Sequence, residues 1–208
     1  MRFGRGEQSD ADVEAPGWDA IDAALSKLYP GTEPVHVAPG LGPYLGGGVQ
    51  GISAYPAEGH WHLVTYGLSE LYVKESANLG VSGFGYELTF RIPRREEQDS
   101  PADWPFRLLE KVAITQHEGT DYRAGSRLHV GGPIDGERSQ LTVLAFTVDS
   151  ELEPIETPNG RLEFLQLVGV TEEEAQLMKQ STTADVLAAI AEENPRLVTD
   201  PSRSQPLR

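Results

Sequence analysis

Apolar positions recur along the chain with two different periods. Between residues 18 and 29 they fall at spacings of 3, 4, 3 and 1, as on one face of an amphipathic helix. The residues are Trp18, Ile21, Leu25, Leu28 and Tyr29. Pro30 and Gly31 follow directly, so the pattern predicts a helix that stops at residue 29.

Alternation with period two predicts strands. In YELTFRI (86–92), four apolar side chains alternate with Glu87, Thr89 and Arg91, as on a strand with one buried face. GISAYPA and HWHLVTYGL predict two consecutive strands joined by a turn at Glu58 and Gly59.

The second half of the chain predicts further strands. SRLHV and LTVLAFTVD read as two strands, and ETPNGRLEFLQLVGV as a hairpin with Asn159-Gly160 as its turn. RLVTD, near the end, predicts a last short strand.

Three more helices are indicated by start signals or apolar spacing. One is expected after Ser100 as N-cap, with Pro101 at the first helical position. Another is expected at Thr171, because T-E-E-E fits a capping box with Glu174. A final helix is expected over 183–193.

The order of these elements predicts the fold class. Strands and helices do not alternate regularly, so we expect an α+β fold with a mixed, mainly antiparallel β-sheet flanked by helices. We expect one domain over 16–200, with disordered tails at 1–15 and 201–208, because both ends are polar and lack periodicity.

Composition narrows the class of protein. The 208 residues include no cysteine, which excludes disulfides and thiolate metal sites. No secretory signal and no apolar run of about 18 residues is present, so we expect a soluble cytoplasmic protein without a membrane partner. The net charge is −15, and residues 149–200 hold 12 acidic and 3 basic residues. This charge disfavours nucleic acid and favours basic partners.

His60 and His62 are the first candidate for chemistry. Side chains two residues apart on a strand share a face, so H-x-H can supply two ligands to zinc or iron. A third ligand would have to come from a distant residue, and the candidates are Glu70, Glu87, His117 and His129. A metal-dependent enzyme is therefore one hypothesis. The alternative is that both imidazoles are structural groups on a sheet, with Trp61 on its opposite face.

Other catalytic motifs fit poorly. GVSGFG (80–85) departs from G-x-S-x-G because Phe84 holds the final glycine position, and the glycines of GLGPYLGGG (40–48) do not match G-x-G-x-x-G. The second segment is therefore interpreted as a glycine-rich loop. We expect no catalytic residue and no cofactor.

Aromatic side chains gather in sequence around Gly67, Gly83 and Gly85. They are Trp61, Tyr66, Tyr72, Phe84 and Tyr86. Such a group supports either a strand core or an exposed recognition surface.

HWHLVTYGLSELY (60–72) followed by SGFGYELTFRI (82–92) resembles the Suppressor of fused family. WPFRLLEKV and PIETPNGRLEFLQLVGVTEEE resemble its N-terminal domain in the same order, so the likeness runs from about Trp18 to Asp200. The residues that carry the resemblance most clearly are His60, Trp61, His62, Tyr66, Gly67, Leu68, Ser69, Leu71, Tyr72, Gly83, Phe84, Gly85, Glu87, Leu88 and Thr89.

The resemblance implies a mixed α/β domain that binds a protein and is not an enzyme. Single-domain bacterial members resemble immunity proteins, so one expectation is a toxin–antitoxin role in which this acidic chain neutralises a basic toxin domain. The other is a regulatory scaffold that sequesters an endogenous partner. We expect a monomer or weak oligomer. The candidate partner-binding residues are Asp149, Glu151, Glu153 and Glu156.

Overall fold

The computed structural model describes residues 14–39 and 47–204. The expected N-terminal tail at 1–15 and the glycine-rich loop at 40–48 fall largely outside these ranges, as do the last four residues of the chain. Arg203 lies inside them, and its Nη1 is 2.6 Å from Oε1 of Glu174. The packed fold therefore continues beyond residue 200, where the sequence predicted a tail.

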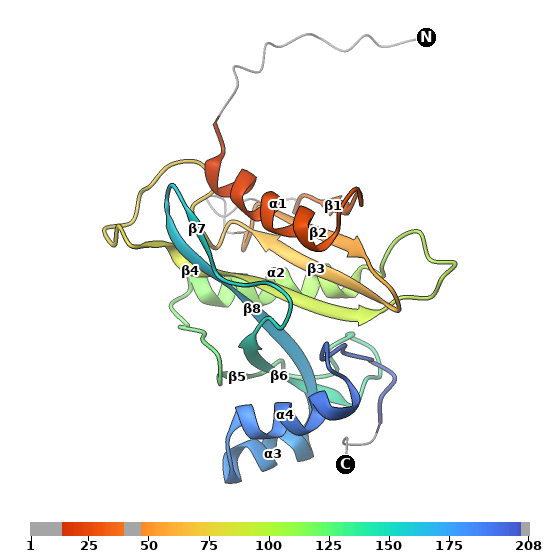
Figure 1. Ribbon diagram of the computed structural model, residues 1–208. Coiled ribbons are helices and arrows are strands. Elements are labelled where there is room, and N and C mark those ends of the chain that lie inside the picture. The colour runs from red at the N-terminus through yellow and green to blue at the C-terminus, as the bar shows by residue number, and fades with distance from the viewer. Residues whose placement is uncertain (1–13, 40–46, 205–208) are drawn as a thin grey trace.

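The described residues form four helices and eight strands (Figure 1). In chain order they are α1 (Pro16–Leu28), β1 (Val35–Val37), β2 (Gly51–Pro56), β3 (His60–Tyr66), β4 (Val81–Pro93), α2 (Trp104–His117), β5 (Arg127–His129), β6 (Leu141–Val148), β7 (Ile155–Thr157), β8 (Gly160–Thr171), α3 (Glu172–Gln180) and α4 (Thr183–Glu193).

These strands make one sheet in the order β1-β2-β3-β4-β8-β6-β5, and β7 pairs with β8 beside this path. Strands β4 and β8 are parallel, and the other pairs are antiparallel. The predicted α+β class with a mainly antiparallel sheet is confirmed.

One face of the sheet packs against α2 through one apolar cluster. Leu63 of β3 pairs with Phe90 of β4, and Phe90 pairs with Leu167 of β8, so the three side chains form a row across the sheet. Trp61 lies in the same cluster, together with Leu109 of α2.

The opposite face carries two separate apolar clusters. Val64 and Phe164 pack against α1, whereas Val168 and Val170 pack against α3 and α4. Figure 1 shows these helices over different parts of the sheet, with α1 near β2 and β3 and the pair α3–α4 near β6. The stretch between the two clusters is polar, and it holds the site described below.

Helices α1, α3 and α4 follow their sequence signals. Helix α1 ends at Leu28, just before Pro30, and α4 spans the predicted 183–193. Thr171 caps α3 as predicted, since its side chain accepts the backbone N–H of Glu174 while the Glu174 carboxylate accepts that of Thr171.

The predicted start of α2 was wrong. The helix begins at Trp104 with Asp103 as N-cap residue, not after Ser100. Pro105 explains the difference, because a helix that began at Pro101 would place a proline without an N–H in its interior. Starting at Trp104 leaves Pro105 in the first turn, where its missing N–H costs nothing.

Two other local predictions were also wrong. Thr157 pairs with Gly160, so the hairpin loop is Pro158-Asn159 and Gly160 already belongs to β8. Pro158 fixes the backbone angle that the first turn position needs. The segment 196–200 is not a strand. The Asn194 side chain donates to the backbone carbonyl of Val198 and accepts its N–H, so these groups are not free to pair with a strand.

Candidate functional site

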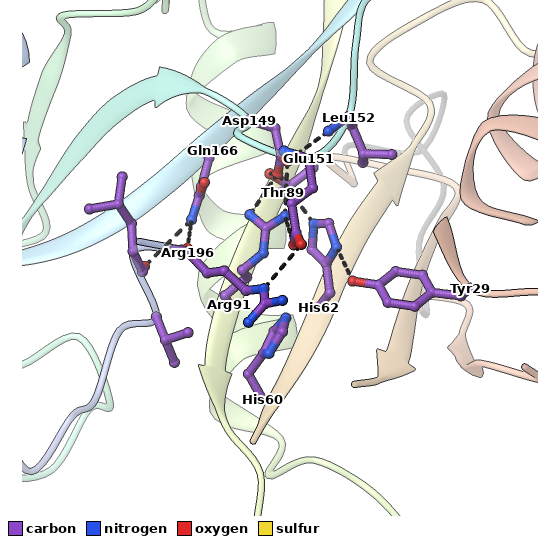
Figure 2. A network of polar contacts seen from close by, with 12 residues as sticks. Tyr29, His60, His62, Thr89, Arg91, Asp149, Glu151, Leu152, Gln166 and Arg196 are labelled. Carbon is purple, nitrogen blue, oxygen red and sulfur yellow. Dashed lines mark hydrogen bonds and ion pairs between the residues drawn. The ribbon is translucent and has the colours of Figure 1, made fainter. Parts of the chain in front are cut away.

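A buried ion pair lies at the centre of the polar stretch (Figure 2). Nη1 of Arg91 is 2.8 Å from Oδ2 of Asp149, and Nη2 donates to Oδ1 at 2.9 Å. Asp149 also accepts the Thr89 hydroxyl at 2.6 Å and the backbone N–H groups of Glu151 and Leu152. A charge in the interior is stable only with such a full set of partners.

Glu151 connects this pair to the C-terminal segment. Its Oε2 lies 3.1 Å from Nη2 of Arg91, and its Oε1 lies 3.0 Å from Nε of Arg196. Gln166 of β8 donates to the backbone carbonyl of Arg196 at 2.9 Å. The network therefore joins β4 and β8 to the segment that follows α4 (Figure 2).

His62 lies at the other side of the same ion pair. The Tyr29 hydroxyl and His62 Nδ1 are 2.8 Å apart, so a neutral ring can accept the hydroxyl proton there. Its Nε2 lies 3.3 Å from Oδ2 of Asp149, a close contact that falls short of hydrogen-bond geometry. His60 is also buried, and its Nδ1 donates to the carbonyl of Glu58 at 3.1 Å.

The electrostatics keep His62 neutral and Asp149 charged. Burial, followed by the positive charge of Arg91, lowers the pKa of His62 to about 4. Burial opposes ionisation of Asp149, but its contacts with His62 and Arg91 outweigh burial and hold its pKa well below the ordinary value. Burial also lowers the pKa of His60.

Within the described part of the chain, His60 and His62 are not joined by a third side chain that could ligate a metal. Among residues 14–39 and 47–204, no group of three or more His, Asp or Glu side chains is arranged to hold a metal ion. The candidate third ligands make other contacts: Glu70 with Lys74, Glu87 with Ser69, His117 with Gly48 and His129 with Glu172. The Nδ1 atoms of His60 and His62 contact the Glu58 carbonyl and the Tyr29 hydroxyl, and the neighbouring Trp61 packs on the α2 face.

The four acids predicted to meet a partner separate into two groups. Asp149 is 6% exposed and is fully engaged inside the chain, so its predicted role in direct partner contact needs correction. Glu151 is half-buried and holds Arg91 and Arg196. Glu153 and Glu156 are exposed, and for them partner binding stays a prediction.

A second site lies where β3 and β4 diverge. A surface pocket of about 430 Å³ opens there between the segment after β3, the start of β4 and the end of α2. Tyr72, Val73 and Phe84 line it and are 41%, 60% and 41% exposed. Of the five aromatics singled out in the sequence, Trp61, Tyr66 and Tyr86 are core residues, whereas Tyr72 and Phe84 belong to this surface.

Two carboxylates fix the backbone around the pocket. Glu87 is buried and accepts the N–H groups of Gly67 and Ser69, each at 2.9 Å, and the Thr65 hydroxyl at 2.7 Å. Burial raises the pKa of Glu87, and the hydrogen bonds from Ser69, Thr65 and Gly67 oppose that rise.

Glu70 is the second of these carboxylates. It accepts the N–H groups of Glu75 and Gly83 at 2.7 and 3.1 Å and pairs with Lys74 at 2.7 Å. Partial burial opposes its ionisation, but these bonds outweigh burial and lower the pKa of Glu70 to about 2.

Gly83 shows why the sequence needs glycine here. Its φ is +56°, and a Cβ at this position would lie 2.5 Å from the carbonyl oxygen of Leu68. That close approach lets Phe84 N–H donate to the same carbonyl at 3.0 Å. Ser82, the serine of GVSGFG, is buried and accepts the N–H of Glu70, so it supports the backbone and is not exposed as a nucleophile.

Sequence reasoning located part of this site and missed the rest. Most family-like residues between Gly67 and Glu87 form the pocket or its frame. The roles of Glu70 and Glu87 were missed, because no sequence motif marks a carboxylate that binds the backbone N–H groups of an irregular loop. The sequence placed Arg91 on the polar face of its strand. That placement was the one hint that Arg91 would need an acidic partner inside the fold.

The comparisons with known proteins agree with this fold. The family profile described as Suppressor of fused protein (SUFU) matches residues 48–204, about three quarters of the chain. The chain belongs to the Suppressor of fused family. It is 32% identical to the Suppressor of fused homologs of Homo sapiens and Mus musculus, in alignments that cover 91% of this chain and 43% of each relative. The chain thus spans less than half the length of these relatives.

Solved structures of family members superpose closely. A crystal structure of the Sufu–Fu complex matches with a TM-score of 0.86 and 28% identity, covering 93% of both chains. Drosophila Suppressor of Fused matches with a TM-score of 0.87 and 27% identity, over 93% of this chain and 52% of that one. A homolog from Neisseria gonorrhoeae FA 1090 shares the fold at 15% identity, with a TM-score of 0.65.

A helix must be long and apolar to span a membrane. Within residues 14–39 and 47–204, the described helices do not meet this requirement.

Proposed function

We propose that this chain is a non-enzymatic protein-binding domain that regulates a partner by sequestering it. The observation that carries the proposal is the contrast between its interior and its surface. The buried carboxylates of the described chain, Glu87, Asp149 and Glu174, all accept hydrogen bonds from within the chain. They stabilise the fold and leave little for acid–base chemistry, whereas the pocket at Phe84 offers apolar side chains to a partner.

The comparisons support the same class of function. One structure similar to this chain is that of Sufu in a complex with Fu, so a domain of this fold can hold another protein. The partner of the present chain is a separate question, because the identity is 28%.

The finer proposal concerns the partner's charge. We infer that it is a basic protein, and a toxin domain neutralised by direct binding is the specific candidate. The support is the net charge of −15 and the number of exposed acids in the C-terminal third. These acids are Glu153, Glu156, Glu172, Glu173, Asp185, Glu192, Glu193 and Asp200. Such a surface attracts a basic partner and accelerates association at low salt.

Affinity capture tests the general proposal. The purified chain should retain a protein from extracts of its native cells in a 1:1 complex, and binding to the purified candidate should weaken as salt rises. Failure of any protein to bind the purified chain directly would contradict the sequestering function.

Co-expression tests the specific candidate. If a toxin gene lies beside the gene for this chain, co-expression should protect cells from that toxin. Undiminished killing would contradict the immunity role while leaving the general binding function in place, because an endogenous partner would still be captured.

A further inference from the structure

The pocket beside Phe84 exposes apolar side chains together, which is the observation to be explained. Single exposed hydrophobic residues are common on soluble proteins and need no function. Here Tyr72, Val73 and Phe84 line one hollow of about 430 Å³, and Leu68 and Leu71 beneath them are buried. That volume lies in the usual range of ligand pockets, roughly 300–1,000 Å³.

The pocket is held in place by polar contacts that do not cover it. The carboxylates of Glu70 and Glu87 bind backbone N–H groups on both sides of the pocket. The Phe84 ring meets His117 of α2 edge to face, with centroids 5.0 Å apart, and His117 Nε2 donates to the carbonyl of Gly48 at 2.9 Å. A partner that binds such a rigid surface loses little conformational entropy from it.

The charges around the pocket indicate the chemistry of the occupant. Its lining includes Glu70, Glu75 and His117. The charge of Glu70 is matched by Lys74, whose Nζ lies 2.7 Å away. Glu75 is exposed at the rim, and its carboxylate adds one negative charge beside the apolar side chains. A basic group of the partner is therefore complementary to the rim, as it is to the chain as a whole.

We propose that this pocket is the recognition site of the chain, and that it receives one large apolar side chain of a partner protein next to a Lys or Arg that meets Glu75. The inference rests on the proposed protein-binding function and adds the place and the chemistry of recognition. Aromatic anchors buried in a pocket carry much of the binding energy in protein interfaces, and the surrounding charges set specificity.

A selection with displayed peptides tests the chemistry directly. A library of random 12-residue peptides is selected on the wild-type chain, and the affinities of the enriched peptides are measured by fluorescence anisotropy. We expect the enriched peptides to share an aromatic, Leu or Met residue with Lys or Arg nearby. No enrichment, or enrichment of acidic peptides, would overturn the proposal.

Matched variants test the place. Phe84→Ala should weaken binding of the enriched peptides about tenfold or more, the effect of a typical anchor contact. Val73→Ser should also weaken binding without changing the charge of the rim, and because Val73 is 60% exposed this variant should fold normally. Leu79→Ala is the control, since Leu79 is 78% exposed near the same loop but does not line the pocket.

The charge of Glu75 is tested in the same assay. Glu75→Lys should lower the affinity for basic peptides several-fold at low salt. At high salt the affinities of the variant and the wild type should be similar. Equal affinity of the wild type, Phe84→Ala and Val73→Ser would overturn the pocket proposal. If a native partner also bound all of them equally, the protein-binding function would stand and only its location would be wrong.

Discussion

The two faces of the central sheet are stabilised by different kinds of contact. The α2 face is one continuous apolar cluster that includes Trp61, Phe90 and Leu167. On the opposite face, α1 and the pair α3–α4 cover separate apolar clusters, and the Arg91–Asp149 network fills the interval. The first face is stabilised by buried apolar surface area, whereas the second depends on the pairing of buried charges. The two faces should therefore respond differently to mutation and to pH.

Removing the Trp61 side chain from the α2 face should cause one of the two largest losses of stability. Trp61 is fully buried, so Trp61→Ala should lower the free energy of unfolding by about 3–5 kcal/mol through lost burial and a residual cavity. Urea denaturation measures this change. The loss should be nearly independent of pH between 5 and 8. A loss much smaller than this would show that α2 moves to fill the cavity left by the indole ring.

Removing one partner of the ion pair should cost a similar amount for another reason. Asp149→Ala leaves the Arg91 guanidinium buried without its main counter-charge, which costs about 3–5 kcal/mol. The double variant Arg91→Met/Asp149→Leu should recover part of this loss in the same denaturation assay, because it removes both charges together.

Glu153→Ala is the matched control for that comparison. Glu153 is an exposed acid on the same segment, so the variant should change the unfolding free energy by no more than about 0.5 kcal/mol. A double variant as unstable as Asp149→Ala would contradict the view that the charges are exchangeable for apolar packing.

The polar face should also be the acid-sensitive one. The folded chain holds His62 neutral with a pKa of about 4, whereas the unfolded chain protonates it near its ordinary value. The unfolded state therefore binds more protons below about pH 6.5, and stability falls as pH drops until the folded pKa is reached. Between pH 7 and 5 the loss should be on the order of 2 kcal/mol.

His62→Gln should flatten this part of the pH profile, measured as unfolding free energy against pH. Trp61→Ala should keep the wild-type slope, since it leaves the network's side chains in place. An unchanged slope in His62→Gln would assign the acid sensitivity to other groups.

Phe84 should behave unlike Trp61, although both are aromatic residues of the same family-like segment. Because Phe84 is 41% exposed, Phe84→Ala should lower the unfolding free energy by about 1 kcal/mol or less. Thermal and urea unfolding measure this. A loss as large as that of Trp61→Ala would make Phe84 a core residue and weaken its assignment to a binding surface.

The smallest effect is expected from metal removal. His60 and His62 lack a third ligand within the described chain, so untagged protein should carry substoichiometric metal by elemental analysis. A chelator should leave the melting temperature unchanged. One equivalent of bound metal, lost on changing His60 to Ala, would revive the metal-dependent enzyme.

Local patterns predicted most of the fold. The capping box at Thr171 and the alternation over 86–92 depend on residues within a few positions of one another, so they can be read directly. The start of α2 was misjudged because two prolines compete within five residues, and 196–200 was misjudged because side chains replaced strand partners.

The candidate site was less predictable for a physical reason. Alternation placed Arg91 on the polar face of its strand, but its partner Asp149 lies 58 positions away and was expected at the surface. A carboxylate is stable at the surface, or in the interior when it has hydrogen-bond and charge partners. Whether Asp149 is buried therefore depends on its pairing with Arg91. Likewise, Phe84 and Trp61 look equivalent in sequence until α2 covers one of them and leaves the other exposed.

By itself, the sequence determined most of the secondary structure, the alternation of strand 86–92, and the family resemblance, because these depend on local spacing and residue type. Only the tertiary structure decided which polar residues are buried together, which aromatics remain at the surface, and that Glu70 and Glu87 hold a pocket open. Those outcomes depend on complementary groups that meet only after distant segments pack, and no local rule encodes such a meeting.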